Sequence, residues 1–167
     1  PLIKDCKLAL DAGAIGLIIP MIKNGKQLAD LIENSLYPPN GKRGVGFCRA
    51  NLYGRNFEDN MKLGLKPLII PQIENTDAIN NLDNILENKN IDAILIGPYD
   101  LSASLGCTGK FDDKKFKNAL ETIKNKCSEY NVPAGIHIVE PCIKKLKQGI
   151  KDGFKFIAYS IDSVFIE

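Results

Sequence analysis

The sequence has no apolar run long enough to cross a membrane, since none approaches the roughly 18 residues that a transmembrane helix needs. It also has little excess charge: 22 Lys and Arg residues stand against 20 Asp and Glu residues, and the lysines are scattered along predicted helices. No basic patch is interleaved with aromatic residues, and no nucleic-acid-binding motif is recognisable. We therefore expect neither a membrane nor a nucleic acid as a partner.

Cysteines are few and irregularly spaced. There are five, none of them in a Cys-x-x-Cys pair: Cys6, Cys48, Cys107, Cys127 and Cys142. An odd number at irregular spacing argues against a disulfide framework and against a structural zinc site. We expect free thiols that fill small apolar spaces, in a protein of the reducing cytoplasm.

Apolar runs of strand length recur five times, at residues 14–20, 67–74, 91–97, 133–139 and 154–160. They are rich in β-branched residues, their apolar residues are nearly continuous, and Gly or Pro bounds them. This pattern is typical of strands buried on both faces of a parallel sheet. Segments with helical spacing of apolar residues precede the first run and separate the others. This order predicts an α/β protein with right-handed crossovers and a single domain.

Two acidic residues stand where predicted strands end. Glu74 closes the second run, and Asp100 follows the third after a Gly-Pro turn. Sites in parallel α/β folds form at the carboxyl ends of strands, and adjacent strands would bring these two positions close together. A pair of oxygen ligands with open coordination positions suits Mg²⁺ or Mn²⁺. The backbone N–H groups at residues 97–100 favour a bound carboxylate.

Each acid also has a purely structural interpretation. Asp100 precedes the segment at 101–106, predicted to be helical, and fits an N-cap, which contributes about 1 kcal/mol without any ligand. Glu74 fits a residue that complements the dipole of the helix predicted after it. Spacing alone leaves the functional and structural interpretations open for both residues.

Several motifs in a fixed order resemble the HpcH/HpaI aldolase family (2,4-dihydroxyhept-2-ene-1,7-dioate aldolase type), and the resemblance covers nearly the whole chain. A set of motifs in the right order is far more specific than any one of them. The most telling are P-Q-I-E and I-G-P-x-D-L-S-x-x-L-G, which end two successive strands. The matching segments lie at residues 16–24, 37–46, 49–54, 71–74, 91–106 and 153–158.

The resemblance implies a TIM (β/α)₈ barrel and a metal-dependent (class II) pyruvate aldolase. The family's metal-binding glutamate and aspartate fall on Glu74 and Asp100, and its binding site for the substrate carboxylate falls on the backbone near Gly97, Tyr99 and Asp100. Bound Mg²⁺, Mn²⁺ or Co²⁺ would stabilise the pyruvate enolate while a 4-hydroxy-2-oxo acid is cleaved to pyruvate and an aldehyde. The family further suggests a homo-oligomer, namely a hexamer.

The glycine- and arginine-rich segment at 37–56 is the one long stretch without strand or helix periodicity. Loops of that length are usually functional. In the family it lies near the site and the subunit contacts, so Arg43 and Arg49 are candidates for closing the site or binding the far end of the substrate. A loop-stabilising or solvated role is an equal alternative.

The chain contains only part of the barrel that the resemblance implies. A complete barrel needs about 250 residues, whereas these 167 residues supply roughly the last five strand-helix units. Residues 1–167 are therefore expected to be one partial barrel domain, truncated at both ends, with the catalytic base and the arginine of the family upstream of Pro1. His137, the only histidine, lies inside a predicted strand and is not assigned as the base.

Two alternatives stay open. The chain could be a catalytically incomplete family member that binds a 2-oxo acid or serves as an assembly subunit. An independent five-stranded flavodoxin-like domain also fits the strand count. The latter is disfavoured because no glycine-rich phosphate loop follows the first strand.

Overall fold

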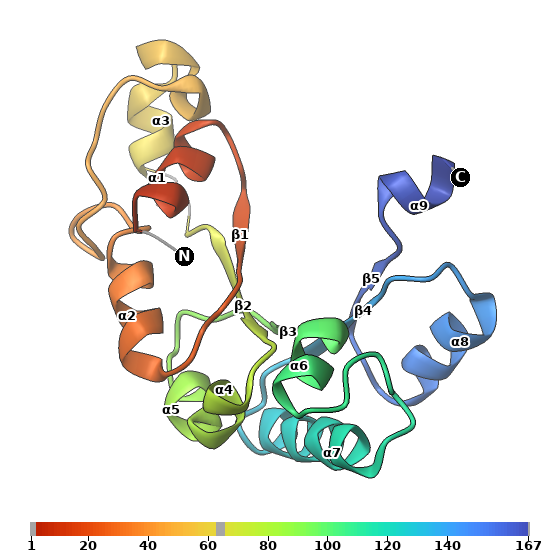
Figure 1. The fold of residues 1–167 in the computed structure, drawn as a ribbon. Helices are drawn as coiled ribbons and strands as arrows, with labels where there is room; N and C mark the ends of the chain where they lie inside the picture. The colour runs from red at the N-terminus through yellow and green to blue at the C-terminus, as the bar shows by residue number, and fades with distance from the viewer. Residues whose placement is uncertain (1–2, 63–65, 167) are drawn as a thin grey trace.

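The computed structural model describes residues 3–62 and 66–166. Five parallel strands form one sheet in sequential order, and each lies within the apolar run predicted for it. Figure 1 shows the sheet curled, with α2, α5, α7 and α8 on its outer side. The strands are β1 (Gly16–Ile19), β2 (Leu68–Ile73), β3 (Ile94–Ile96), β4 (Ala134–Ile138) and β5 (Phe156–Tyr159).

Helices connect successive strands, so each crossover joins two neighbours in the sheet. A curled sheet of parallel neighbours in chain order is part of a (β/α)₈ barrel. The flavodoxin-like alternative is wrong, because that fold places its second strand at the edge, outside the first. The helices are α1 (Ile3–Asp11), α2 (Gly25–Glu33), the 3₁₀ helix η1 (Arg49–Gly54), α3 (Phe57–Lys62), α4 (Thr76–Asn80), α5 (Leu82–Leu86), α6 (Pro98–Ser104), α7 (Lys114–Glu129), α8 (Ile143–Lys151) and α9 (Asp162–Ile166).

The start of α6 corrects one expectation. The helix begins at Pro98, with Gly97 as its N-cap, so Asp100 lies in the first turn and is not the cap. Proline is favoured at the first helical position because its missing N–H would have no intrahelical partner there. Asp100 instead complements the positive end of the helix dipole.

The helix predicted after Glu74 is also interrupted. It forms two short helices, α4 and α5, separated at Asn81, whose backbone has φ −109° and ψ 19°. The Asn75 side chain caps α4 by accepting a hydrogen bond of 2.9 Å from the Ala78 N–H.

Within the described residues, no helix is both long enough and apolar enough to cross a membrane.

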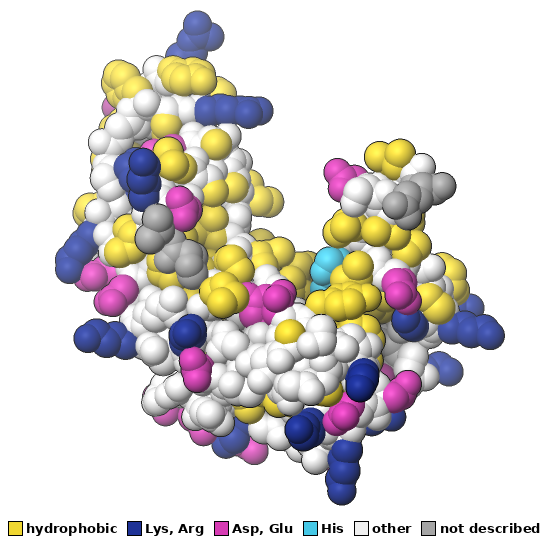
Figure 2. Space-filling view, in the orientation of Figure 1, with side chains coloured by type: hydrophobic (Ala, Val, Ile, Leu, Met, Phe, Trp, Pro, Cys, Tyr) yellow, Lys and Arg dark blue, Asp and Glu magenta, His cyan; other side chains and the backbone are white. Residues whose placement is uncertain are grey.

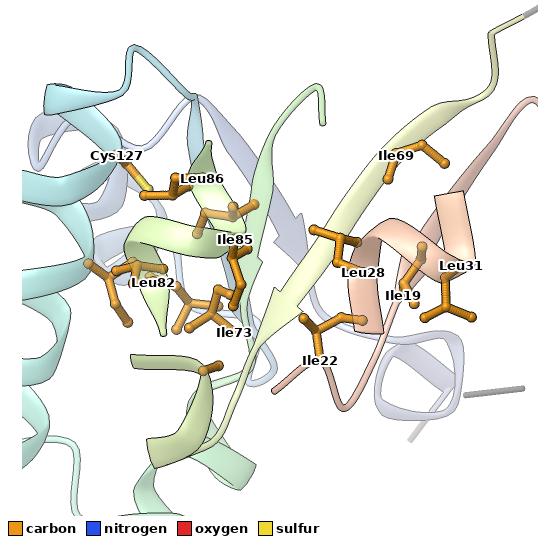
Figure 3. Close-up of a cluster of buried hydrophobic side chains, with 14 of the residues drawn as sticks. Ile19, Ile22, Leu28, Leu31, Ile69, Ile73, Leu82, Ile85, Leu86 and Cys127 are labelled. Atoms are coloured by element: carbon orange, nitrogen blue, oxygen red, sulfur yellow. The ribbon is translucent and has the colours of Figure 1, made fainter. Parts of the chain in front are cut away.

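The hydrophobic core fills the space between the outer face of the sheet and the helices. Figure 3 shows Ile19 and Ile69, from β1 and β2, near Leu28 and Leu31 of α2. A second group in the same view, formed by Ile73, Leu82, Ile85, Leu86 and Cys127, joins β2 to α5 and α7. These side chains are almost fully buried, so this face of the sheet carries the packing.

The inner face of the sheet is open. Ile18 and Leu68 alternate with buried neighbours along their strands and are each 47% exposed. Figure 2 shows this side hollowed between two arms, with hydrophobic side chains in yellow along parts of the hollow. In a β-barrel, the inward-pointing side chains of the strands face one another across the interior. The hollow inner face of this sheet corresponds to part of such an interior.

Candidate functional site

Glu74 and Gly97 stand side by side at the carboxyl ends of β2 and β3. The two strands pair in register through Ile73 and Ile96, so the next position on each strand is also adjacent. A Cβ added to Gly97 would lie 2.8 Å from Oε2 of Glu74 and 2.6 Å from Nε2 of Gln72. The Glu74 carboxylate therefore rests directly against the backbone of Gly97, in space that only glycine leaves.

The Glu74 side chain is held in one orientation. It is 3% exposed. Its Oε1 accepts a hydrogen bond of 2.6 Å from the backbone N–H of Met21, which follows β1 and has a φ of 57°. Its Oε2 accepts a hydrogen bond of 2.5 Å from Nε2 of Gln72. Glu74 thus links the carboxyl ends of β1 and β2 and does not simply complement the dipole of α4.

The electrostatics of the site set Glu74 apart from a solvated acid. Burial raises the pKa of Glu74, the hydrogen bond from Met21 lowers it, and the negative charge of Asp100 raises it again. The net result is a raised pKa of Glu74, with burial as the largest cause. Asp100 itself is exposed in the first turn of α6.

Carboxylates are the kind of ligand that a divalent cation takes. Oxygen ligands of this kind are preferred by Mg²⁺ and Mn²⁺, which use one or two carboxylates and leave positions for water and substrate. A cation beside Glu74 and Asp100 would offset both the burial of one charge and the repulsion between the two. Among the described residues there is no group of three or more His, Cys, Asp or Glu that could hold a metal.

The other residues expected around the substrate carboxylate lie in the same turn. The backbone N–H of Gly97 donates to the Ile73 carbonyl at 3.3 Å and is therefore already engaged. Pro98 has no N–H, and the N–H groups of Tyr99 and Asp100 belong to the first helical turn, where no intrahelical acceptor exists. The exposed Tyr99 ring packs edge-on against Phe111, with 5.1 Å between ring centroids.

Arg43 and Arg49 lie elsewhere in this chain. Both line a cavity with Ile15 and Pro67, the residues just before β1 and β2. That is the amino end of these strands, whereas Glu74 stands at the carboxyl end. Their expected contact with a substrate stays a prediction.

His137 lies within β4, as its strand pattern indicated. The His137 ring is half-buried, and its Nε2 lies 3.2 Å from the backbone oxygen of Ser160, just after β5. This contact ties two neighbouring strand ends together. The residues that sequence analysis left without a role at the site are Met21 and Gln72, although both lie inside the motifs already noted.

The comparisons with known proteins agree with this architecture. The family model described as HpcH/HpaI aldolase/citrate lyase matches residues 1–166. The 2-keto-3-deoxy-L-rhamnonate aldolase of Escherichia coli (strain K12) is 34% identical over 166 residues, which cover 98% of this chain and 60% of the relative. The chain thus spans about three fifths of the length of the curated relatives that it matches.

Solved structures show the same fold. An HpcH/HpaI aldolase/citrate lyase family protein from Burkholderia cenocepacia J2315 superposes with a TM-score of 0.91 at 26% identity, covering 99% of this chain and 65% of that one. The HpcH/HpaI aldolase from Desulfitobacterium hafniense DCB-2 gives 0.86 at 24% identity, covering 99% and 64%. Protein CitE from Mycobacterium tuberculosis, solved with magnesium and acetoacetate, gives 0.64 at 13% identity, covering 96% and 58%. The chain belongs to the HpcH/HpaI aldolase/citrate lyase family.

Proposed function

We propose that this chain is part of a metal-dependent aldolase that cleaves a 4-hydroxy-2-oxo acid to pyruvate and an aldehyde. The observation that carries the proposal is the buried Glu74 carboxylate at the carboxyl end of β2, with Asp100 in the first turn of the helix that follows the neighbouring strand β3. Family membership and an aldolase among the relatives support the reaction class.

Glu74 and Asp100 are the proposed ligands of the cation. The hydrogen bonds from Met21 and Gln72 orient the Glu74 carboxylate, so this ligand is fixed before anything binds. Fixed ligands bind more tightly because less conformational freedom is lost on binding. Asp100 is exposed and can adjust. Mg²⁺, Mn²⁺ or Co²⁺ bound by the pair would supply a Lewis acid that polarises the 2-oxo group of the substrate.

The turn between β3 and α6 is the proposed site for the substrate carboxylate. Gly97 leaves the space beside Glu74 open, and a side chain there would collide with the carboxylate. The N–H groups of Tyr99 and Asp100 point along the first turn of α6, where an anion is favoured. The Tyr99 ring, exposed and braced by Phe111, borders this turn.

The ligand assignment is tested by Mn²⁺ titration of the full-length protein, followed by electron paramagnetic resonance. We expect saturable binding that Glu74→Gln and Asp100→Asn each weaken at least about tenfold, as loss of a direct ligand should. Asp30→Asn is the matched control, since it removes an exposed carboxylate from α2. Equal binding in all four proteins would refute the ligand assignment.

The reaction is tested separately by pyruvate release from a 4-hydroxy-2-oxo acid in the full-length protein. Release that a chelator stops and Mn²⁺ restores is the expected result. The alternative of a catalytically incomplete member predicts Mn²⁺ and pyruvate binding without any turnover. The two experiments together separate a wrong site from a wrong activity.

A further inference from the structure

A second cavity lies at the amino end of β1 and β2, away from the edge that carries Glu74. It has a volume of about 580 Å³, within the usual size of small-molecule pockets. The end of α1, the residues before each strand and the start of η1 surround it. Glu74, Gly97, Tyr99 and Asp100 are not part of its lining, whereas Arg43 and Arg49, which the sequence suggested for substrate contact, are.

The lining of this cavity carries charge of one sign. Three cationic side chains, Arg43, Arg49 and Lys66, lie among the described lining residues, and no Asp or Glu does. Lys66 lies 3.8 Å from Asp92, and Arg43 is paired with Asp11, but neither acid is part of the lining. A concave surface lined by one sign of charge concentrates ligands of the opposite sign.

Arg43 forms the buried part of the site. Its side chain is 6% exposed, one of its Nη2 hydrogens is donated to Oδ1 of Asp11 at 2.8 Å, and its guanidinium carbon lies 4.4 Å from the centroid of the Tyr37 ring. Its Nε is buried and has no hydrogen-bond partner among the described residues. Nearly all buried polar atoms in native proteins have one. Asp11 and Tyr37 thus hold the guanidinium in place, and its Nε–H is left without an acceptor in the part of the chain that the structure describes.

The rest of the lining is mainly apolar. Leu10, Ile15, Leu52 and Pro67 contribute aliphatic surface, and Asn60 adds an amide. A buried planar guanidinium, exposed cations and apolar walls together match an anionic group attached to an apolar body. A bare inorganic ion would use the charges and leave the walls without a partner.

We propose that this cavity binds a small organic anion, with its carboxylate or phosphate at Arg43 and its apolar part against Leu10, Leu52 and Pro67. Arg49 and Lys66, both exposed, draw the anion in from solvent. The site is independent of the proposed aldolase reaction. It lies at the end of the strands where barrel enzymes do not place their catalytic residues.

The test is calorimetric titration of the full-length protein with phenyl phosphate, benzoate and benzyl alcohol. The two anions share a ring and differ in the charged group, so they tell a phosphate site from a carboxylate site, and the alcohol reports binding of the ring alone. We expect saturable binding of at least one anion and none of the alcohol. Arg49→Gln and Lys66→Gln should each weaken that binding about threefold, as expected for an exposed charge.

Arg43→Lys should weaken binding about tenfold or more, because it keeps the charge beside Asp11 and removes the planar fork. Lys147→Gln is the matched control: it removes an exposed charge from α8, outside the cavity, and should leave affinity within about twofold. Absence of saturable binding in the unmodified protein would overturn the proposal. So would an equal loss in Lys147→Gln and Lys66→Gln, or a loss in Glu74→Gln, which would locate the anion at the other end of the strands.

Discussion

Replacing Gly97 with Ala is the sharpest perturbation of the candidate site, because the added methyl group has a known collision. It would lie 2.6 Å from Nε2 of Gln72, 2.8 Å from Oε2 of Glu74 and 3.1 Å from Cβ of Glu74. The first two atoms belong to side chains that hydrogen-bond each other, so neither can swing away alone. The Glu74 carboxylate must therefore leave its position against β3.

The size of the effect follows from those contacts. Overpacking of this kind costs about 1–3 kcal/mol, and the lower entropy of the unfolded chain with Ala returns about 0.4–1 kcal/mol. A net loss of about 1–2 kcal/mol should lower Tm by about 2–8 °C in a domain of this size. Displacing an oriented ligand should also weaken Mn²⁺ binding about 10- to 100-fold.

Differential scanning calorimetry and Mn²⁺ titration measure the two effects. Gly46→Ala is the matched control, since no described residue other than its chain neighbours has an atom within 4 Å of a Cβ built there, and its φ is not in the left-handed region. We expect that control to keep its Mn²⁺ affinity and to change Tm little. A Gly97→Ala protein that melts and binds Mn²⁺ like the unmodified protein would refute the packing of Glu74 on Gly97.

The remaining predictions concern three other groups. The folded pKa of Glu74 is raised, so its contribution to stability is full below the unfolded pKa and is lost as pH rises through the folded pKa. In urea unfolding without divalent cations, the free energy of unfolding should therefore depend less on pH in Glu74→Gln than in the unmodified protein. Parallel curves would contradict this. Ser160→Gly should raise Tm, because Ser160 has a φ of 62° and a buried Oγ without a partner among the described residues, which together cost on the order of 1 kcal/mol or more. An unchanged or lower Tm would count against that strain. Burial raises the pKa of Cys127 to about 12, whereas backbone N–H groups of Lys145 and Lys144 lower the pKa of Cys142. Mass spectrometry after brief alkylation at pH 8 should therefore find Cys142 modified well before Cys127. The reverse order would contradict the described surroundings of the two thiols.

Local sequence pattern was enough to predict the strands, whereas their sequential order in the sheet followed from the family resemblance. The run at 91–97 is almost entirely apolar, and β3 at Ile94–Ile96 is buried on both faces, as a central parallel strand should be. The same logic located the ends of the strands, and hence Glu74. The local pattern did not predict the role of Asp100 correctly. Because Pro98 strongly prefers the first helical position, α6 begins before Asp100 and not after it.

Other features of the site depend on contacts between distant parts of the chain. The N–H that fixes Glu74 comes from Met21, 53 residues earlier, and is in place only because β1 and β2 pair with Gly16 opposite Leu68. Nothing in the pattern around Met21 marks its backbone as a donor to a carboxylate. The position of Arg43 was equally unpredictable, because its loop has no periodicity that a pattern could read.

The sequence by itself determined the alternation of buried strands and amphipathic helices, and it placed two acids at the ends of adjacent strands. These features follow from side-chain burial and turn chemistry within a few residues. Only the tertiary structure decided which backbone groups surround Glu74, that Arg43 lies at the opposite end of the sheet, and that a cationic cavity forms there. Those outcomes depend on strand register and on how the curled sheet brings remote segments together, and no short stretch of residues encodes either.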